Sequence, residues 1–275
     1  MQDLIIPPLP IVVTEVIKFD ATDPKHGAAD LEVIVAPDKG ISADLLRVSN
    51  SAFYGRGGKV KTLKDALSIL GIKATKNLVI FLSTKAMSAN LKSETFKKYL
   101  NQFPIYCALY AQKIATETKH ANMSDECFLG ALLHSIGLNI MALSKQMHFS
   151  SMIEACEKNK WDILKLEKDS YGTTHVELGK QAAEKWNLPQ HYHNLMNISV
   201  RSQPTELTEL IMQITFIAAV ISSSLLQIPL PEKATDNAKS VCALLTSDTT
   251  LISRLMLPAE FEKIKNHPFA QMAGL

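Results

Sequence analysis

The residues with the clearest capacity for chemistry lie in one apolar segment near the middle of the chain. His134 and Ser135 stand within CFLGALLHSIGLNIMAL, the stretch from Cys127 to Leu143. An imidazole nitrogen is a good ligand for a divalent metal, and a bound metal lowers the pKa of a coordinated water that can then attack a phosphoester. A lone histidine in an apolar helix is, however, more often a core residue with a satisfied hydrogen bond. The segment therefore allows two interpretations, a core histidine or one ligand of a hydrolytic metal site.

The rest of the sequence offers little other catalytic chemistry. It contains no G-x-S-x-G, no P-loop and no G-x-G-x-x-G motif. His191 and His193 are two residues apart, so on a helix they point in different directions and do not chelate one ion together. Asp162, Glu167 and Asp169 are acidic neighbours, which we interpret as the solvated face of a helix.

Helices must position these side chains, because helical periodicity dominates the chain and hairpin signals such as Asn-Gly are absent. The first helix is expected to start near Pro10, since proline suits the first helical turn. Thr62 and Ser124 are expected N-caps, and a turn is expected around Tyr171-Gly172. The other expected helices cover Ala29–Val35, Ser42–Asn50, Leu63–Leu70, Lys73–Asn90, Phe103–Thr118, Asp125–Leu143 and His175–Trp186.

Composition indicates a folded globular protein. The chain has 275 residues, of which 47% are hydrophobic and 20% charged, and its net charge is +2. These values exclude a disordered chain and a strong polycation. Four cysteines, without a C-x-x-C pair, fit reduced and mostly buried thiols. They are Cys107, Cys127, Cys156 and Cys242.

A membrane span and a signal peptide are not expected. The N-terminal MQDLIIPPLP has no basic region followed by an apolar run. The stretch Leu210–Pro231 has no charged residue and is long enough to span a bilayer. It also contains Gln213, Gln227 and the triplet Ser222–Ser224, so a buried core helix is the better interpretation. We therefore expect a cytoplasmic protein.

Five strings stand out along the chain: IPPLP (Ile6–Pro10), LLRVSNSAFYG (Leu45–Gly55), DALSILGIKATKNLVI (Asp65–Ile80), GALLHSIG (Gly130–Gly137) and THVELGKQAAEKWNLP (Thr174–Pro189). Their order and spacing resemble the HDOD family (HD-related output domain) of bacterial regulators. The family resemblance covers about residues 5–200 and implies an all-α multi-helix bundle. It also implies an N-terminal helical lobe over 1–100 and an HD-like lobe with a C-terminal helical extension over 101–275.

The resemblance also implies a degenerate metal site. Members of the HD superfamily bind a divalent metal through an adjacent His and Asp, but here Ser135 stands at the Asp position. The other ligand positions fall on Phe103, on Ser199 and Val200, and near Ala218 and Ala219. His134 is thus the one clear survivor, and a single imidazole does not hold a catalytic ion. We expect no catalysis, no metal and no cofactor; the alternative is a divalent metal at an altered site around His134 and Ser135.

The preferred interpretation is a non-catalytic signal-transduction module that binds a protein partner. The alternative is a metal-dependent phosphohydrolase of the HD superfamily. Asn50 and Ser51 are expected to cap and tie together the N-terminal helices, and His175 to orient the turn before its helix. The candidate interaction or structural residues from the shared motifs are Pro7, Pro8, Pro10, Asn50, Ser51, Tyr54, His134, His175 and Trp186.

A lysine-rich segment, residues 56–98, is a candidate surface for an anionic partner. It has ten basic residues against Asp65 and Glu94, a local net charge of +8. Only Arg56 is an arginine and aromatic residues are few, whereas base recognition uses arginine forks and stacking rings. Nucleic acid is therefore an unlikely partner, and a solvated lysine-rich surface is the simpler interpretation.

Overall fold

Helices fill almost the whole chain, as the periodicity predicts. The computed structural model describes residues 4–20, 23, 25–54 and 58–274, and within these ranges no strand occurs. The expected all-α bundle is therefore confirmed. The side chains of Gln146 and His191 lie outside the described set. Gly55, which ends one motif, and Arg56, the first residue of the lysine-rich segment, also lie outside it.

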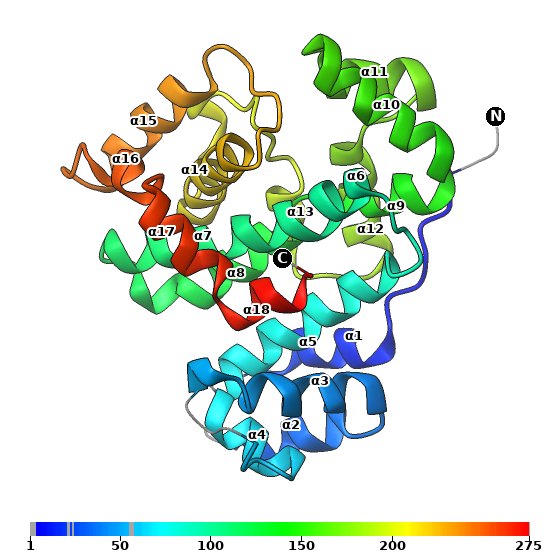
Figure 1. Cartoon of the computed structure of the whole chain (residues 1–275), viewed down its shortest axis with the longest axis vertical. Helices are drawn as coiled ribbons and strands as arrows, with labels where there is room; N and C mark the ends of the chain where they lie inside the picture. Colours follow the sequence, from blue (N-terminus) through cyan, green and yellow to red (C-terminus); the bar gives the residue numbers. More distant parts are fainter. Residues whose placement is uncertain (1–3, 21–22, 24, 55–57, 275) are drawn as a thin grey trace.

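The first part of the chain forms the small lobe at the bottom of Figure 1. Asn50 ties this lobe together, because its amide donates to the carbonyls of Leu46 (3.0 Å) and Val60 (2.8 Å) and its oxygen accepts from the Val60 N–H (3.0 Å). The helices are α1 (Ile11–Lys18), α2 (Ala28–Val35), α3 (Lys39–Ser49), η1 (Ala52–Tyr54), α4 (Leu63–Leu70) and α5 (Ile72–Met87). Thr62 caps α4 through its hydroxyl, as predicted.

The larger lobe surrounds α7, α8 and α14, whose side chains Tyr110, Phe128 and Phe216 are fully buried. Figure 1 shows α18 returning to the junction between the lobes, close to α5. The elements are α6 (Glu94–Phe96), the π-helical turn η2 (Lys97–Gln102), α7 (Phe103–Glu117), η3 (Ala121–Met123), α8 (Ser124–Leu133), α9 (Ile136–Ser144), α10 (Gln146–Asn159), α11 (Ile163–Tyr171), α12 (His175–Lys185), α13 (Gln190–Leu195), η4 (Pro204–Glu206), α14 (Leu210–Leu225), α15 (Ala234–Leu245), α16 (Leu251–Leu255), α17 (Pro258–Lys265) and α18 (Pro268–Met272).

The prediction of one helix over Asp125–Leu143 was wrong in one respect. The helix is interrupted at His134 and Ser135, which separate α8 from α9. Nδ1 of His134 lies 2.6 Å from the carbonyl oxygen of Ala131, the acceptor that the N–H of Ser135 would use in a continuous helix. Ser124 is also not the expected cap, since Met123 precedes the helix and no side chain caps it.

Two long apolar stretches are core helices. The helix α14 buries most of its length, as the sequence predicted for Leu210–Pro231. The stretch Ala121–Ser144 is long and apolar enough to cross a membrane by length and composition, and 89% of its most apolar window is buried inside the structure. A core helix of a soluble protein has the same composition. All four cysteines are free and buried, as expected.

The proline-rich motif forms an extended segment, residues 5–10, that lies on the larger lobe. The N–H of Ile5 donates to the Ser144 hydroxyl (3.2 Å). The carbonyl of Ile6 accepts from Lys185 (2.9 Å), and that of Pro7 accepts from the indole N–H of Trp186 (2.8 Å). Pro7, Pro8 and Pro10 have no N–H to satisfy, so the segment has fewer donors that need a partner. Two separate sequence motifs therefore meet here. Pro10 then precedes α1.

A close crossing at Gly137 joins α9 to α12. A Cβ built on Gly137 would lie 1.8 Å from the carbonyl oxygen of His175 and 3.0 Å from the backbone nitrogen of Gly179. Backbone atoms cannot move aside as a flexible side chain can. Gly137 is therefore the residue that allows α12 to start directly against the break between α8 and α9.

We predict that Trp186→Phe destabilises the protein by about 1–3 kcal/mol, because the Pro7 carbonyl loses its donor. Urea unfolding followed by circular dichroism measures this loss. The matched control is Trp161→Phe, since Trp161 is 52% exposed. Equal effects of the two substitutions would contradict the assigned role of the indole N–H.

We predict that Gly137→Ala destabilises the protein by at least about 3 kcal/mol, because the added methyl group meets backbone. Gly179→Ala on the same interface is the control. A Cβ there would meet only the flexible side chain of Met196, at 3.3 Å from its sulfur. Thermal melting of both variants tests the contrast, and a Gly137→Ala variant as stable as Gly179→Ala would refute it.

Candidate functional site

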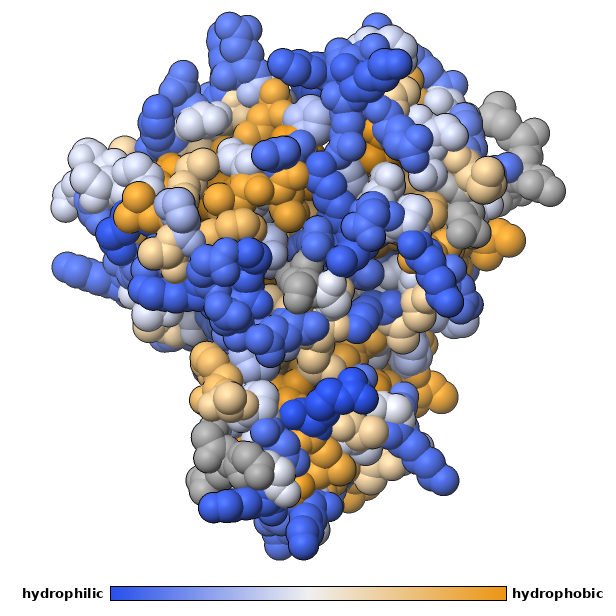
Figure 2. Space-filling view, in the orientation of Figure 1, coloured by the Kyte–Doolittle hydropathy of each residue, from blue (hydrophilic) through white to orange (hydrophobic). Residues whose placement is uncertain are grey.

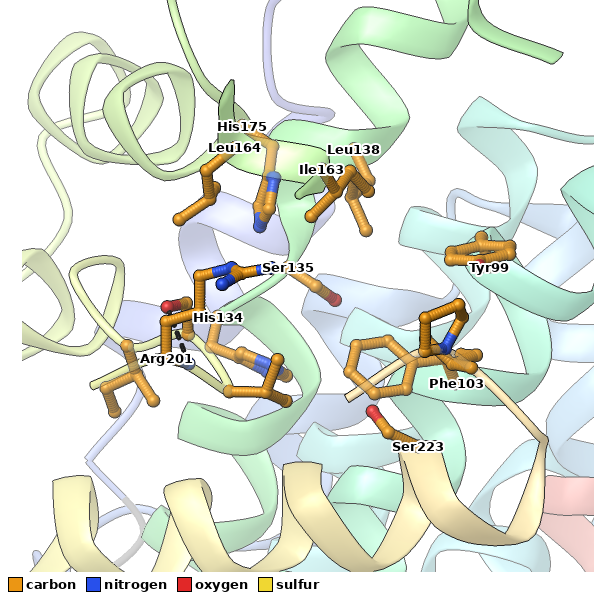
Figure 3. A pocket seen from close by; sticks show the side chains of 15 residues that line it. Tyr99, Phe103, His134, Ser135, Leu138, Ile163, Leu164, His175, Arg201 and Ser223 are labelled. Carbon is orange, nitrogen blue, oxygen red and sulfur yellow. Dashed lines mark hydrogen bonds between the residues drawn. The ribbon is translucent and has the colours of Figure 1, made fainter. Parts of the chain in front are cut away.

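One pocket in the larger lobe collects the residues singled out by the sequence. Its volume is about 560 Å³, part of it open to solvent. Figure 3 shows its walls, which come from η2, α7, the break between α8 and α9, α9 itself, α11, α12, α14 and two connecting segments. The lining residues are Tyr99, Phe103, His134, Ser135, Leu138, Ile163, Leu164, His175, Ile198, Ser199, Val200, Arg201, Ser223, Ile228 and Pro229.

The positions compared with metal ligands mostly converge here. Phe103, His134 and Ser135 line the pocket, and so do Ser199 and Val200. Ala218 and Ala219 do not, because both are completely buried in the core face of α14. Ser223, one turn further along α14 than Ala219, lines the pocket in their place. The late ligand position near Ala218 and Ala219 stays a prediction from the family resemblance, and neither residue lines the pocket.

His134 is a buried neutral imidazole. It is 4% exposed, and the edge of its ring packs against Phe103 with 5.7 Å between ring centroids. A carbonyl oxygen can only accept, so Nδ1 carries the proton that is donated to Ala131, and Nε2 keeps its lone pair. Burial lowers the pKa of His134 to about 4, and the nearby His175 lowers it further against the opposing hydrogen bond. The ring is therefore uncharged at neutral pH.

His175 enters the pocket from the first turn of α12, held by a buried carboxylate. Glu167 is completely buried and accepts from the backbone N–H of His175 (2.9 Å) and from its Nδ1 (2.8 Å). The turn at Gly172, whose φ is +75°, brings α12 back over α11 and makes this contact possible. The expected solvated face is thus wrong for Glu167. Asp162 instead caps α11, and Asp169 is exposed.

Arg201 and three serines supply the remaining polar atoms. Arg201 forms an ion pair with Asp162, with 3.0 Å between its Nε and a carboxylate oxygen, and its backbone N–H donates to the Ser199 hydroxyl at 3.1 Å. The hydroxyls of Ser135 and Ser223 are buried and have no hydrogen-bond partner. Sequence reasoning missed Arg201, because no motif connects it to a capping aspartate on a distant helix. Figure 3 shows the hydroxyls of Ser135 and Ser223, together with the imidazole rings of His134 and His175, directed into the pocket.

The donor set does not fit a catalytic divalent metal. Within the part of the chain that the structure describes, no group of three or more His, Cys, Asp and Glu side chains could hold an ion. His134 and His175 offer two imidazole nitrogens, but Phe103 and Val200 have no donor atom. The carboxylate of Glu167 is occupied by His175. Catalytic zinc sites use three protein ligands, and calcium or magnesium needs oxygen ligands.

The other motif residues lie away from this pocket. Ser51 has a buried hydroxyl without a partner, and Tyr54 packs edge-on against Phe53 at 5.1 Å. Burial raises the pKa of Tyr54. Of these motif residues, Asn50 makes the side-chain hydrogen bonds expected of a residue that ties the N-terminal helices together, whereas the Ser51 hydroxyl makes none.

The lysine-rich segment does not present all its charge to solvent. Lys73 pairs with Asp125 at 3.5 Å and Lys98 with Glu157 at 2.5 Å. Lys76 donates to the Phe19 carbonyl, and burial lowers the pKa of its amine. Acids and carbonyls from other elements therefore neutralise part of the local excess of positive charge.

We predict that His134 makes stability fall as pH drops from about 6.5 to about 4. The unfolded chain takes up a proton at the ordinary pKa, whereas the buried ring resists it down to the lowered pKa. The unfolded state thus binds more protons in this window, and the loss approaches about 3 kcal/mol. Urea unfolding at each pH, compared with His134→Gln, measures it. Burial also lowers the pKa of His267 to about 4, but His267 is present in both proteins, so its contribution cancels in the comparison. Parallel pH profiles would contradict the assignment to His134.

Solved structures of other proteins share this architecture. One is a protein of Shewanella amazonensis SB2B that carries the provisional name phosphohydrolase. It is 21% identical, with a TM-score of 0.66, and the match covers 98% of this chain and 94% of that chain. A protein from Marinobacter aquaeolei VT8, provisionally named for signal transduction, is also 21% identical, with a TM-score of 0.72. That match covers 98% of this chain and 59% of that one. At these identities the likeness establishes the fold.

Sequence relationship gives the family. An uncharacterized protein of Treponema pallidum (strain Nichols) is 22% identical over 213 residues, which are 77% of this chain and 41% of that protein. This chain thus spans about two fifths of the length of that curated relative. The family model of the HDOD domain matches residues 6–201, close to the range that the motifs indicated. The chain belongs to the HDOD domain family.

Proposed function

We propose that the protein is a non-catalytic regulatory module that acts in bacterial signal transduction by binding a protein partner. The observation that carries this proposal is the content of the pocket. Phe103, Ser135 and Val200 stand where HD-type enzymes would need ligands, and none of them supplies a strong ligand for a divalent ion. A site with two imidazoles and no free carboxylate has too few ligands to hold a metal that activates a water in the way HD-type hydrolysis needs.

Relatives of greater length support a modular role. The chain corresponds to 41% of the Treponema pallidum relative and 59% of the Marinobacter aquaeolei protein. In those proteins an HDOD unit is joined to further chain, which fits a domain that passes a signal through contacts. The free and buried cysteines suit a reducing compartment, so we place the protein in the cytoplasm.

Exposed apolar side chains give this module a surface for contacts. Ile5, in the proline-rich segment, is 73% exposed. Leu143 near the end of α9 is 39% exposed, and Met147 at the start of α10 is 83% exposed. The hydrogen bond from Ile5 to Ser144 brings the two segments together. Exposed apolar groups that gather in this way mark interaction surfaces. Figure 2 shows further apolar patches over α14 and α15 and over the small lobe, on a face that is otherwise mostly hydrophilic.

The alternative function is a metal-dependent phosphohydrolase with an altered site. The observation in its favour is that His134 and His175 line one pocket, each with Nδ1 engaged and Nε2 left for a ligand. Metal-binding histidines are oriented in this way. Two imidazoles and serine hydroxyls nevertheless fall short of the three protein ligands that a catalytic zinc uses.

We predict that the purified protein contains substoichiometric metal and does not hydrolyse bis(p-nitrophenyl) phosphate, with or without added manganese. Elemental analysis and the absorbance of released nitrophenol measure the two quantities. Stoichiometric metal, together with turnover that His134→Ala abolishes, would establish the hydrolase instead. Arg47→Gln on the surface of the small lobe is the matched control for handling of the variants.

A further inference from the structure

We propose that the pocket around Ser135 and Ser223 binds a small amphiphilic monocarboxylate, a molecule with an apolar body and one carboxylate. This inference rests on the proposed function, because it treats the former catalytic position as a ligand site. The ligand would be the signal that the regulatory module reads.

The walls suit an apolar body. Most lining side chains are aliphatic or aromatic and come from several elements, including Leu138 on α9 and Ile163 and Leu164 on α11. Ile198 and Ile228 close the space from the connecting segments. About 70 Å³ of this space admits the centre of a water-sized sphere, which is room for part of an apolar chain, and the rest of the pocket is open to solvent. Small-molecule sites likewise combine apolar walls with few polar groups.

Two serine side chains in the pocket have no hydrogen-bond partner. Ser135 is 2% exposed and Ser223 is 1% exposed, and both hydroxyls lack a hydrogen bond in the protein. Buried polar groups without partners cost free energy, which a ligand oxygen can recover. The two serines come from different elements, the break between α8 and α9 and the helix α14. Each hydroxyl has one O–H to donate to a ligand carboxylate.

The charged group in the lining favours a ligand that carries one negative charge. Among the described residues that line the pocket, Arg201 alone is permanently charged, and no Asp or Glu lines it. Its Asp162 partner has a side chain that is 38% exposed, so water can solvate that carboxylate when Arg201 turns to a ligand. A guanidinium fits a carboxylate through two parallel hydrogen bonds. A phosphate dianion would call for more positive charge, and an amine would meet Arg201 without a counter-charge.

Ligand binding would join parts of the lobe that are separate in sequence. The pocket contacts α11, the segment at residues 198–201 and the segment after α14. A ligand that holds these together stabilises one arrangement of the lobe, since anything that binds only the folded protein stabilises it. This is the physical route from ligand to changed partner binding.

The test uses the full chain and three probes of equal length, octanoate, octan-1-ol and octylamine. We expect titration calorimetry to show octanoate binding at least about tenfold more tightly than octylamine, the effect of one favourable charge contact. Octanoate at about one hundred times its dissociation constant should raise the melting temperature by about 5 °C. Absent octanoate binding, or equal binding of all three probes, would overturn the proposal.

Variants then locate the site. Arg201→Gln should weaken octanoate about tenfold or more, whereas Arg47→Gln, which removes an exposed arginine paired with Asp44, should leave affinity unchanged. Ser223→Leu fills the pocket from the other side and should abolish binding even if Arg201→Gln fails to fold. Circular dichroism checks that each variant is folded. Octanoate binding that survives both pocket substitutions would overturn the proposed site.

The outcomes separate this inference from the proposed function. The same preparations are assayed for metal content and for hydrolysis of bis(p-nitrophenyl) phosphate. If octanoate does not bind and the phosphodiester is not hydrolysed, the proposed ligand class is rejected and the regulatory function stands. Turnover with bound octanoate rejects the regulatory function and leaves a ligand site.

Discussion

The crossing of α9 and α12 at Gly137 is the contact on which the pocket depends. With no side chain between the two helices, the carbonyl of His175 lies where a Cβ of residue 137 would be. That approach places the first turn of α12 beside the helix break at His134 and Ser135. Glu167 then reaches the N-terminal N–H of α12 and holds the His175 ring. A larger residue at position 137 would separate the two histidines and open the pocket.

Separate hydrogen bonds and one ion pair hold the polar side chains of the site. His134 is anchored on the Ala131 carbonyl, His175 on the buried Glu167, and Arg201 on Asp162. Phe103 packs its ring against His134. Apolar packing and internal contacts therefore fix the positions of these side chains. Ser135 and Ser223 are the exceptions, and they make the ligand proposal possible.

Contacts between distant segments connect the two lobes. The proline-rich segment crosses to α12 through Pro7 and Trp186, and the C-terminal region returns to the small lobe where Lys85 donates to the Met272 carbonyl. The residues after 201, whose role the sequence left open, supply the core helix α14 and then this return path (Figure 1). A movement of the larger lobe would therefore be transmitted to the N-terminal helices through two contacts, one at Pro7 and Trp186 and one at Lys85 and Met272.

Local patterns in the sequence were enough to determine the all-α class, most helix positions, the cap at Thr62, the core helix α14 and the family. These depend on periodicity, capping and motif order within a few dozen residues, so no tertiary contact is needed to infer them. The tertiary structure alone decided the break at His134, the burial of Glu167, and the entry of His175, Arg201 and Ser223 into the pocket. Each follows from which faces meet when α9, α11, α12 and α14 pack, and a carboxylate that looks solvated in one helix becomes buried once a neighbouring helix N-terminus covers it.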